Sequence, residues 1–147
     1  MELFVIWARA GESPTEHLGV GEDLIITASH SEMPGLVQES HFGVAICKQD
    51  NLDSLAAAVP TKIGEFLASG RPVVVSNGIG DLDQMLTSTK TGVVINQSDS
   101  LETISSQIRG LISDSMTPDR CRALAMQHFD MEKSVDRYLE IYDRMQH

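Results

Sequence analysis

Short runs of apolar, mostly β-branched residues recur along the chain, bounded by glycine, proline, serine or asparagine. There are five such runs: LFVIWA (3–8), LIITAS (24–29), GVAICK (43–48), PVVVSN (72–77) and GVVINQ (92–97). Their apolar residues are continuous rather than alternating with polar ones, which is typical of strands covered on both faces. The pattern therefore predicts the strands of a parallel sheet.

Segments with helical character separate the later runs and follow the last one. Residues 32–40, 61–69 and 81–88 each fit a crossover between neighbouring parallel strands. A longer helix is predicted after residue 99, with Asp99 or Ser100 as its N-cap and an apolar stripe at helical spacing: Leu101, Ile104, Ile108, Leu111 and Ile112. A last helix is predicted over 131–145, with Val135, Leu139 and Tyr142 on one face. The alternation predicts one doubly wound, Rossmann-like α/β domain over residues 1–147.

The charge of the chain restricts its partners. The formal net charge is −10, and lysine and arginine are scattered rather than clustered. DNA, RNA or an anionic membrane would be repelled overall, so we expect no nucleic-acid partner. Any phosphate that the protein binds must be held locally.

Cysteines and histidines give no sign of a metal site or a disulfide. Cys47 and Cys121 have no metal-ligand spacing, and the five histidines form no HExxH or paired arrangement. The N-terminus has neither a basic leader nor a long apolar stretch, so we expect neither a signal peptide nor a membrane anchor. These features predict a cytoplasmic protein without a metal or other cofactor.

The candidate chemistry lies where a loop enters the helix predicted at 61–69. Ligands of open parallel sheets bind beyond the carboxyl ends of the strands. Pro60 suits the start of a helix, which leaves the N–H groups of Thr61, Lys62 and Ile63 free to face an anion. The Thr61 hydroxyl and the Lys62 charge would add to this phosphate site.

The spacing of Ile63, Phe66 and Leu67 predicts the buried face of this helix. Glu65 falls on the other, polar side with Thr61 and Lys62, one turn further on. A carboxylate there is badly placed for phosphate and well placed to accept two hydrogen bonds from a ribose diol. The spacing suits a nucleoside diphosphate. An alternative is that Lys62 and Glu65 form only an exposed i, i+3 ion pair worth about 0.2–0.5 kcal/mol. The motif alone leaves both interpretations open.

The SNGIGD loop, residues 76–81, invites comparison with the dinucleotide-binding fingerprint. Gly78 and Gly80 match, but Asp83 stands in place of the third glycine, and Asp81 would oppose a pyrophosphate. We therefore exclude an NAD or FAD site. The glycines are better suited to tight turns near the sugar end of a ligand, or to a purely structural turn.

The order of these features resembles a known family. The segments IITASHSEMPGLVQESHFGVAICK, PTKIGEFLASGRPVVVSN, TGVVINQSD and HFDMEKSVDRYLEIYDRM are similar to successive motifs in the C-terminal half of retaining GT-B glycosyltransferases of family 4, also called group 1. The PTKIGEFLASGRPVVVS block is the most specific of them. The resemblance covers nearly the whole chain.

The resemblance implies a domain that binds a nucleotide-diphosphate sugar, linked to UDP, GDP or ADP, without a metal. The residue corresponding to Glu65 binds the ribose in this family. The helix start at Thr61 and Lys62 would contact the diphosphate, with Lys62 stabilising the charge that develops on the leaving group. The loop with Ser29, His30 and Met33 would frame the base through backbone contacts.

The resemblance also implies a separate N-terminal domain that binds the acceptor, a glycan or a lipid-linked sugar, as in polysaccharide biosynthesis. The full enzyme would act in the cytoplasm or at the cytoplasmic face of a membrane. Two departures limit the comparison: Ala57 occupies the position of the first motif glutamate, and the first strand with its basic loop is expected to be missing. We therefore expect the chain alone to transfer no sugar.

Three other protein classes share features with this sequence. Half of a UDP-sugar 2-epimerase would share the fold, but no acid/base pair is evident. A phosphoacceptor receiver domain needs aspartates at strand ends, where this chain has Ala8 and Cys47. A noncatalytic α/β binding or scaffold module remains open because of Ala57.

Overall fold

The computed structural model describes residue 29 and residues 31–47 and 61–145 of the 147-residue chain. The chain divides into two compact units, residues 1–40 and 41–147. The strand predicted at 3–8 and all but Ser29 of that predicted at 24–29 lie outside the described residues.

The described part of the first unit contains one helix, α2 (Met33–Glu39), as predicted for 32–40. Pro34 lies in its first turn, where a missing N–H leaves no hydrogen bond unmade. Ser40 ends the helix: its N–H donates to the Leu36 and Val37 carbonyls, and its hydroxyl donates to the Val37 carbonyl at 2.7 Å. Val37 is the buried residue of α2.

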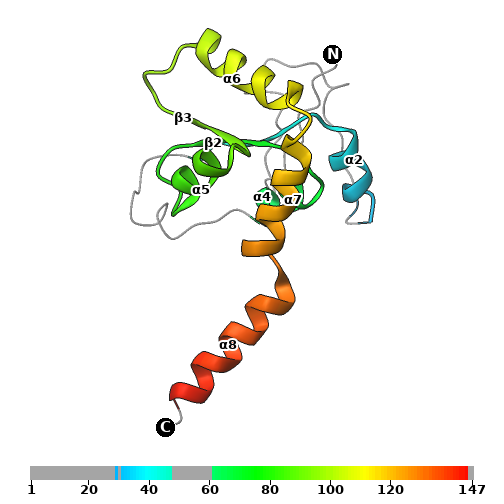
Figure 1. The fold of residues 1–147 in the computed structure, drawn as a ribbon, viewed down its shortest axis with the longest axis vertical. Helices are drawn as coiled ribbons and strands as arrows, with labels where there is room; N and C mark the ends of the chain where they lie inside the picture. The colour runs from blue at the N-terminus through cyan, green and yellow to red at the C-terminus, as the bar shows by residue number, and fades with distance from the viewer. Residues whose placement is uncertain (1–28, 30, 48–60, 146–147) are drawn as a thin grey trace. The chain divides into compact units, whose positions relative to one another are not determined.

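The described part of the second unit contains a parallel sheet of three strands, β1 (Gly43–Ala45), β2 (Val73–Ser76) and β3 (Gly92–Ile95), in the order β1-β2-β3 (Figure 1). The α/β class and the parallel pairing are confirmed. The central strand β2 is buried at all four residues, as its continuous apolar run predicts. Val44 on β1 departs from that expectation, because it is 59% exposed.

The helix α4 (Thr61–Ala68) is the crossover between β1 and β2. Ile63, Phe66 and Leu67 are buried and Thr61 and Glu65 are exposed, which confirms the predicted division of its faces. Gly43 allows the helix to approach the sheet, because a Cβ atom there would lie 2.5 Å from the Phe66 ring. This packing fixes the rotation of α4 about its axis.

The Ser-Gly sequence after α4 ends the helix. Gly70 has φ of +75°, and the N–H groups of Gly70 and Arg71 donate to the carbonyls of Leu67 and Phe66, both at 2.9 Å. This pair of bonds is a Schellman motif, which needs a left-handed residue that glycine adopts without strain. The chain then turns directly into β2.

The next two helices flank β3. Helix α5 (Leu82–Thr89) connects β2 to β3 and buries Leu82 and Leu86. Helix α6 (Leu101–Ser113) begins after Ser100, whose hydroxyl accepts a hydrogen bond from the Thr103 N–H. Ser100 rather than Asp99 is therefore the N-cap. None of the residues of α6 is buried, and Leu101, predicted to lie on its apolar stripe, is 80% exposed.

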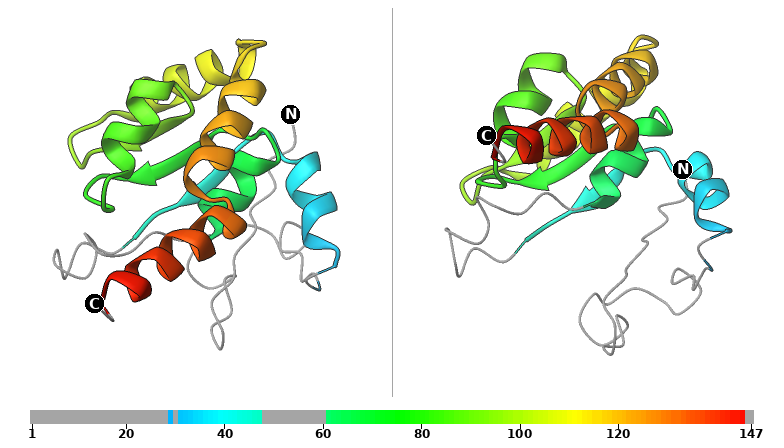
Figure 2. Two further views of the ribbon diagram at one scale, coloured as in Figure 1. Left: turned by 60° about the horizontal axis from the view of Figure 1, so that its bottom comes forward. Right: turned by 90° about the horizontal axis from the view of Figure 1, so that it is seen from below.

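Helix α7 (Thr117–His128) has no counterpart among the sequence predictions. It packs beside α4, with Cys121 and Leu124 buried (Figure 2). Gly64 of α4 faces the C-cap of α7, where a Cβ atom would lie 2.9 Å from the Phe129 ring. The sequence does carry signals for the ends of this helix: Pro118 and Asp119 in its first turn and His128 in its last turn. Its apolar stripe, however, is short and lies among polar residues.

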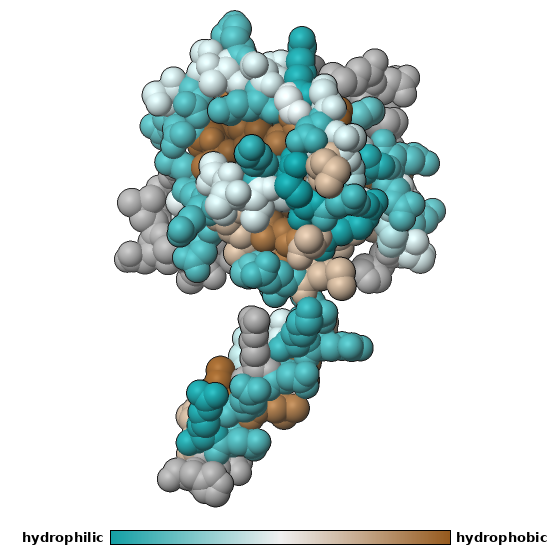
Figure 3. Space-filling view, viewed as in Figure 1, coloured by the Kyte–Doolittle hydropathy of each residue, from teal (hydrophilic) through white to brown (hydrophobic). Residues whose placement is uncertain are grey.

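Helix α8 (Met131–Met145) has the predicted bounds. The N–H groups of Glu132 and Lys133 donate to the Asp130 carboxylate, which caps its start. Val135, Leu139 and Tyr142 share a face as predicted but are exposed, and Figure 3 shows apolar side chains along this helix. No helix in the described part of the chain is long and apolar enough to cross a membrane.

Candidate functional site

Parallel strands place their carboxyl ends at one edge of the sheet. Beyond this carboxyl edge follow Ile46 and Cys47 after β1, residues 77–81 after β2, and residues 96–100 after β3. Because α4 leads from the carboxyl end of β1 to the amino end of β2, it begins at the same edge. The sheet topology therefore brings the start of α4 and the glycine-containing loop 77–81 to one side of the unit.

Hydrogen bonds between strand ends fix this edge. The Cys47 N–H donates to the Ser76 hydroxyl at 3.0 Å, and the Asn77 N–H donates to the Ile95 carbonyl, also at 3.0 Å. Ser76 is buried, so its hydroxyl serves the sheet rather than a ligand. These bonds hold the backbone in place where the three strands end.

The polar side chains of α4 have no partners within the described part of the molecule. Thr61 and Glu65 are exposed and Lys62 is half-buried, and none of the three side chains makes a hydrogen bond or ion pair to another described residue. In particular, Lys62 and Glu65 do not form an i, i+3 ion pair with each other. A donor, a cation and an acceptor therefore remain available along one face of α4.

The backbone at the start of α4 supplies further donors. The first N–H groups of a helix have no acceptor within that helix, and the helix dipole favours an anion beside them. Ile63 can contribute only its N–H, because its side chain is 1% exposed and lies in the core. The N-terminal turn of α4 thus combines donors suited to a phosphate with a carboxylate one turn later.

Gly78 and Gly80 both adopt the positive φ values of tight turns, +82° and +50°. Between them Ile79 is fully buried and anchors the loop. The Gly78 N–H donates to the Asp83 Oδ2 at 2.9 Å, so the loop closes on a carboxylate of the protein itself. The N–H that would face a pyrophosphate in a dinucleotide site thus already has an anionic partner.

Ser29 and Met33, the residues predicted to frame a base, lie in the other unit. The Ser29 N–H and hydroxyl donate to the Glu32 carboxylate at 2.8 and 2.6 Å, and these bonds lower the pKa of Glu32 below its usual range. Both polar groups of Ser29 thus serve the turn that leads into α2. The Ser-x-x-Glu pattern of a capping box was the signal for this role, and sequence reasoning missed it.

Met33 is the first residue of α2 and is half-buried. The candidate residue His30 lies outside the described residues, as do Ala57 and Pro60. The structure therefore brings together the α4 residues and the loop glycines at one edge, and it gives no spatial relation between them and the 29–33 segment.

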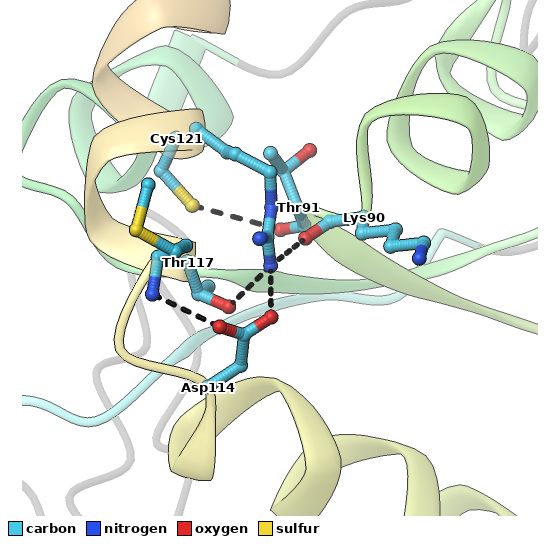
Figure 4. A network of polar contacts seen from close by, with 7 residues as sticks. Lys90, Thr91, Asp114, Thr117 and Cys121 are labelled. Carbon is cyan, nitrogen blue, oxygen red and sulfur yellow. Dashed lines mark hydrogen bonds and ion pairs between the residues drawn. The ribbon is translucent and has the colours of Figure 1, made fainter.

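The opposite, amino edge of the sheet holds a polar network that sequence reasoning did not identify (Figure 4). The Arg120 guanidinium donates to the Asp114 carboxylate and the Thr117 hydroxyl, both at 2.8 Å, and to the Lys90 carbonyl at 3.4 Å. The Met116 N–H, followed by Arg120, lowers the pKa of Asp114 below its usual range. These contacts link α5, α6 and α7, while the buried Arg120 Nε has no hydrogen-bond partner among the described residues.

Cys121 belongs to the same edge. Its thiol lies 3.9 Å from the Thr91 carbonyl, and burial raises its pKa to about 11 (Figure 4). A thiol that remains protonated and enclosed is unreactive. Cys121 therefore serves packing between α7 and the start of β3.

An open hollow of about 340 Å³ lies at this amino edge, over the start of β3. Figure 3 shows apolar surface between α5 and α6 in this region. Its charged lining residues include Lys90, Asp114 and Arg120. Asp114 and Arg120 bind each other there, whereas the Lys90 and Gln107 side chains make no hydrogen bond or ion pair to another described residue.

Among the residues that the structure describes, no group of three or more histidine, cysteine, aspartate or glutamate side chains could hold a metal ion. No protein-family model, curated protein or solved structure matches the chain.

Proposed function

We propose that this chain is the donor-binding domain of a retaining glycosyltransferase, the C-terminal half of a doubly wound GT-B fold that binds a nucleotide-diphosphate sugar. One observation carries the proposal. Helix α4 begins at the carboxyl edge of a parallel sheet and presents Thr61, Lys62 and Glu65 there without partners among the described residues. The similarity of its sequence to the PTK block of family 4 enzymes supports the same assignment.

The diphosphate of the donor would lie at the start of α4. The N–H groups of Thr61, Lys62 and Ile63 would donate to phosphate oxygens, and the Lys62 ammonium would offset their charge. A net charge of −10 makes such a local arrangement necessary, since the molecule as a whole repels anions.

Glu65 would bind the ribose. Three residues of helix rise by about 4.5 Å, which is close to the step from a phosphate to the adjoining sugar ring. A carboxylate can accept hydrogen bonds from two neighbouring hydroxyls at once. An exposed Glu65 is therefore suited to a diol, whereas the buried side chain of Ile63 is not available to any ligand.

Lys62 would also act in the chemical step. When the bond between the anomeric carbon and the diphosphate oxygen breaks, negative charge accumulates on the departing diphosphate. Donors already aimed at such a charge are worth roughly 3–4 kcal/mol each in comparable sites. The acceptor, a glycan or lipid-linked sugar, would come from a separate domain at the cytoplasmic face of a membrane, and we expect no transfer by the 147-residue chain alone.

A second candidate is a noncatalytic α/β module with a vestigial ligand site. It is favoured by the contacts of Ser29 and Gly78, whose polar groups already bind Glu32 and Asp83 of the same chain. Such a module would have no preference for nucleotides. Binding measurements separate the two candidates.

Calorimetric titration with UDP, GDP and ADP tests the proposal. We expect one of the three to bind the parent chain, and Glu65→Ala and Lys62→Ala each to weaken that binding by about 10-fold to 100-fold, the loss that accompanies hydrogen bonds to charged groups. Both side chains lie outside the core, so the thermal unfolding midpoints should stay near that of the parent.

Two control variants remove the same charges elsewhere. Glu140→Ala removes an exposed carboxylate from α8, and Lys90→Gly removes a cation from the amino edge. Both should bind the nucleotide as the parent does. Indifference of the parent to all three nucleotides would favour the noncatalytic module, and unchanged binding by Glu65→Ala would remove the ribose assignment.

A further inference from the structure

A carboxylate outside α4 also contributes to the carboxyl edge. Asp83 lies in the first turn of α5, and its Oδ2 accepts the hydrogen bond from the Gly78 N–H across the 77–81 loop. We propose that Asp83 is a positioning residue: it holds Gly78 so that the loop keeps the conformation that receives the donor nucleotide sugar. This inference rests on the proposed function.

The loop needs such a restraint at Gly78. Its neighbours are fixed by other contacts, Asn77 through its N–H to the Ile95 carbonyl and Ile79 through complete burial. Gly78 itself is exposed and has φ of +82°, in a region that glycine leaves easily because it is equally free to adopt others. The Asp83 contact therefore selects one conformation of the exposed part of the loop.

The second oxygen of Asp83 indicates that this carboxylate does more than close a turn. Its Oδ1 is buried and has no hydrogen-bond partner. A buried oxygen without a partner lowers stability, so the bond from Gly78 to Asp83 is kept at a cost to the fold. The arrangement therefore costs stability that a simple turn would not require.

The charge of Asp83 also makes the start of α5 chemically different from the start of α4. A negative charge in the first turn of α5 interacts favourably with that helix dipole and opposes a phosphate at the same place. The start of α4, with Lys62, has no such anion in its first turn. The diphosphate is thereby directed to α4, and the loop held by Asp83 faces the uncharged part of the ligand.

The test combines nucleotide titration with amide hydrogen exchange, measured by NMR on the 147-residue chain. Asp83→Ala should speed exchange of the Gly78 amide and weaken binding of UDP, GDP or ADP, whichever the parent binds, by about fivefold to tenfold. Asp83→Asn should keep Gly78 protected and bind within about twofold of the parent, because its amide oxygen can accept the same bond.

Asp114→Ala is the matched control. Asp114 also accepts a backbone N–H, that of Met116 at 2.9 Å, but at the amino edge. This variant should unfold at a lower temperature than the parent and bind the nucleotide equally well. It shows whether a loss of affinity follows from lower stability alone.

The outcomes separate the two proposals. If the parent binds a nucleotide and Asp83→Ala binds it equally well while Gly78 exchanges faster, the positioning role is wrong and the proposed function stands. Unchanged Gly78 exchange in Asp83→Ala also overturns the positioning role. If the parent binds none of the nucleotides, the proposed function fails first, and the inference that rests on it fails with it.

Discussion

The two edges of the sheet use their charged side chains in opposite ways. At the amino edge, Arg120 joins Asp114, Thr117 and the Lys90 carbonyl in one network. At the carboxyl edge, Lys62 and Glu65 lie one turn apart on α4 and bind neither each other nor another described side chain. Polar groups that satisfy one another stabilise a fold, whereas polar groups without partners on a rigid frame are available to a ligand.

Helix α4 is held rigidly against the rest of the second unit. Ile63 and Leu67 anchor α4 in the core, and Gly64 places it against Phe129 at the end of α7. The available side chains of α4 therefore project from a helix whose position is set by packing. Substitutions at the amino edge should change stability, and substitutions on the polar face of α4 should change binding.

The largest effect on stability is expected from Arg120→Ala. It removes the donor to the Thr117 hydroxyl, which is buried, and leaves Asp114 without its ion pair. Leaving a buried polar group without a partner costs about 1–3 kcal/mol of unfolding free energy, measurable by urea denaturation. Nucleotide affinity should not change.

Arg109→Ala is the control for Arg120→Ala. Arg109 is exposed on α6 and has no hydrogen bond or ion pair within the described residues. It removes the same charge and should leave the unfolding free energy near that of the parent. Equal losses in the two variants would mean that the network does not stabilise the amino edge.

A smaller, pH-dependent effect is expected at Asp114. The Met116 N–H and Arg120 lower its pKa in the folded state, so its contribution is present above the unfolded pKa, near 3.9, and is lost as the pH falls further. Denaturation at a series of pH values should show the parent more stable than Asp114→Asn at neutral pH, with the difference shrinking below about pH 4.

Asp143→Asn provides the comparison for this series. Asp143 is exposed on α8 and makes no ion pair with another described residue. Its pH dependence should follow that of the parent. A difference between parent and Asp114→Asn that does not change with pH would contradict the charge-based explanation.

The smallest effect, a stabilisation, is expected from Lys90→Gly. Lys90 ends α5 with φ of 54°, and the Thr91 N–H donates to the Leu86 carbonyl in a Schellman arrangement that favours glycine. Relief of the left-handed strain should raise the unfolding free energy by about 0.5–1 kcal/mol, since glycine gives back part of the gain as chain entropy. Lys90→Ala cannot relieve the strain and should not raise the unfolding free energy. Thermal unfolding of the parent and the two variants measures both effects.

The sequence predicts the elements well where one physical signal dominates. Continuous apolar runs indicated β2 and β3, and the spacing of Ile63, Phe66 and Leu67 indicated both α4 and its buried face. Helix α7 was missed because its buried residues are few and lie among polar ones, so its position depends on contacts with α4 that periodicity does not report.

Predicting the site required knowing which polar side chains form hydrogen bonds within the protein. Sequence reasoning predicted this for only some of them. It identified the polar face of α4, but it assigned Ser29 to a ligand without recognising the Glu32 carboxylate that binds it. It noted only that Asp83 stands in place of the third glycine of the dinucleotide-binding fingerprint. It did not predict that the Asp83 carboxylate accepts a hydrogen bond from the Gly78 N–H. Such pairings depend on turn geometry as well as on residue type.

The most direct test is a map of nucleotide contacts on the backbone. In ¹⁵N NMR spectra titrated with UDP, GDP and ADP, the amides of Thr61, Lys62 and Ile63 should shift most, followed by Gly78, whereas those of Gly92 and Arg120 should stay in place. Shifts concentrated around Gly92 and Arg120, or no shift with any of the three nucleotides, would contradict a donor site at the start of α4.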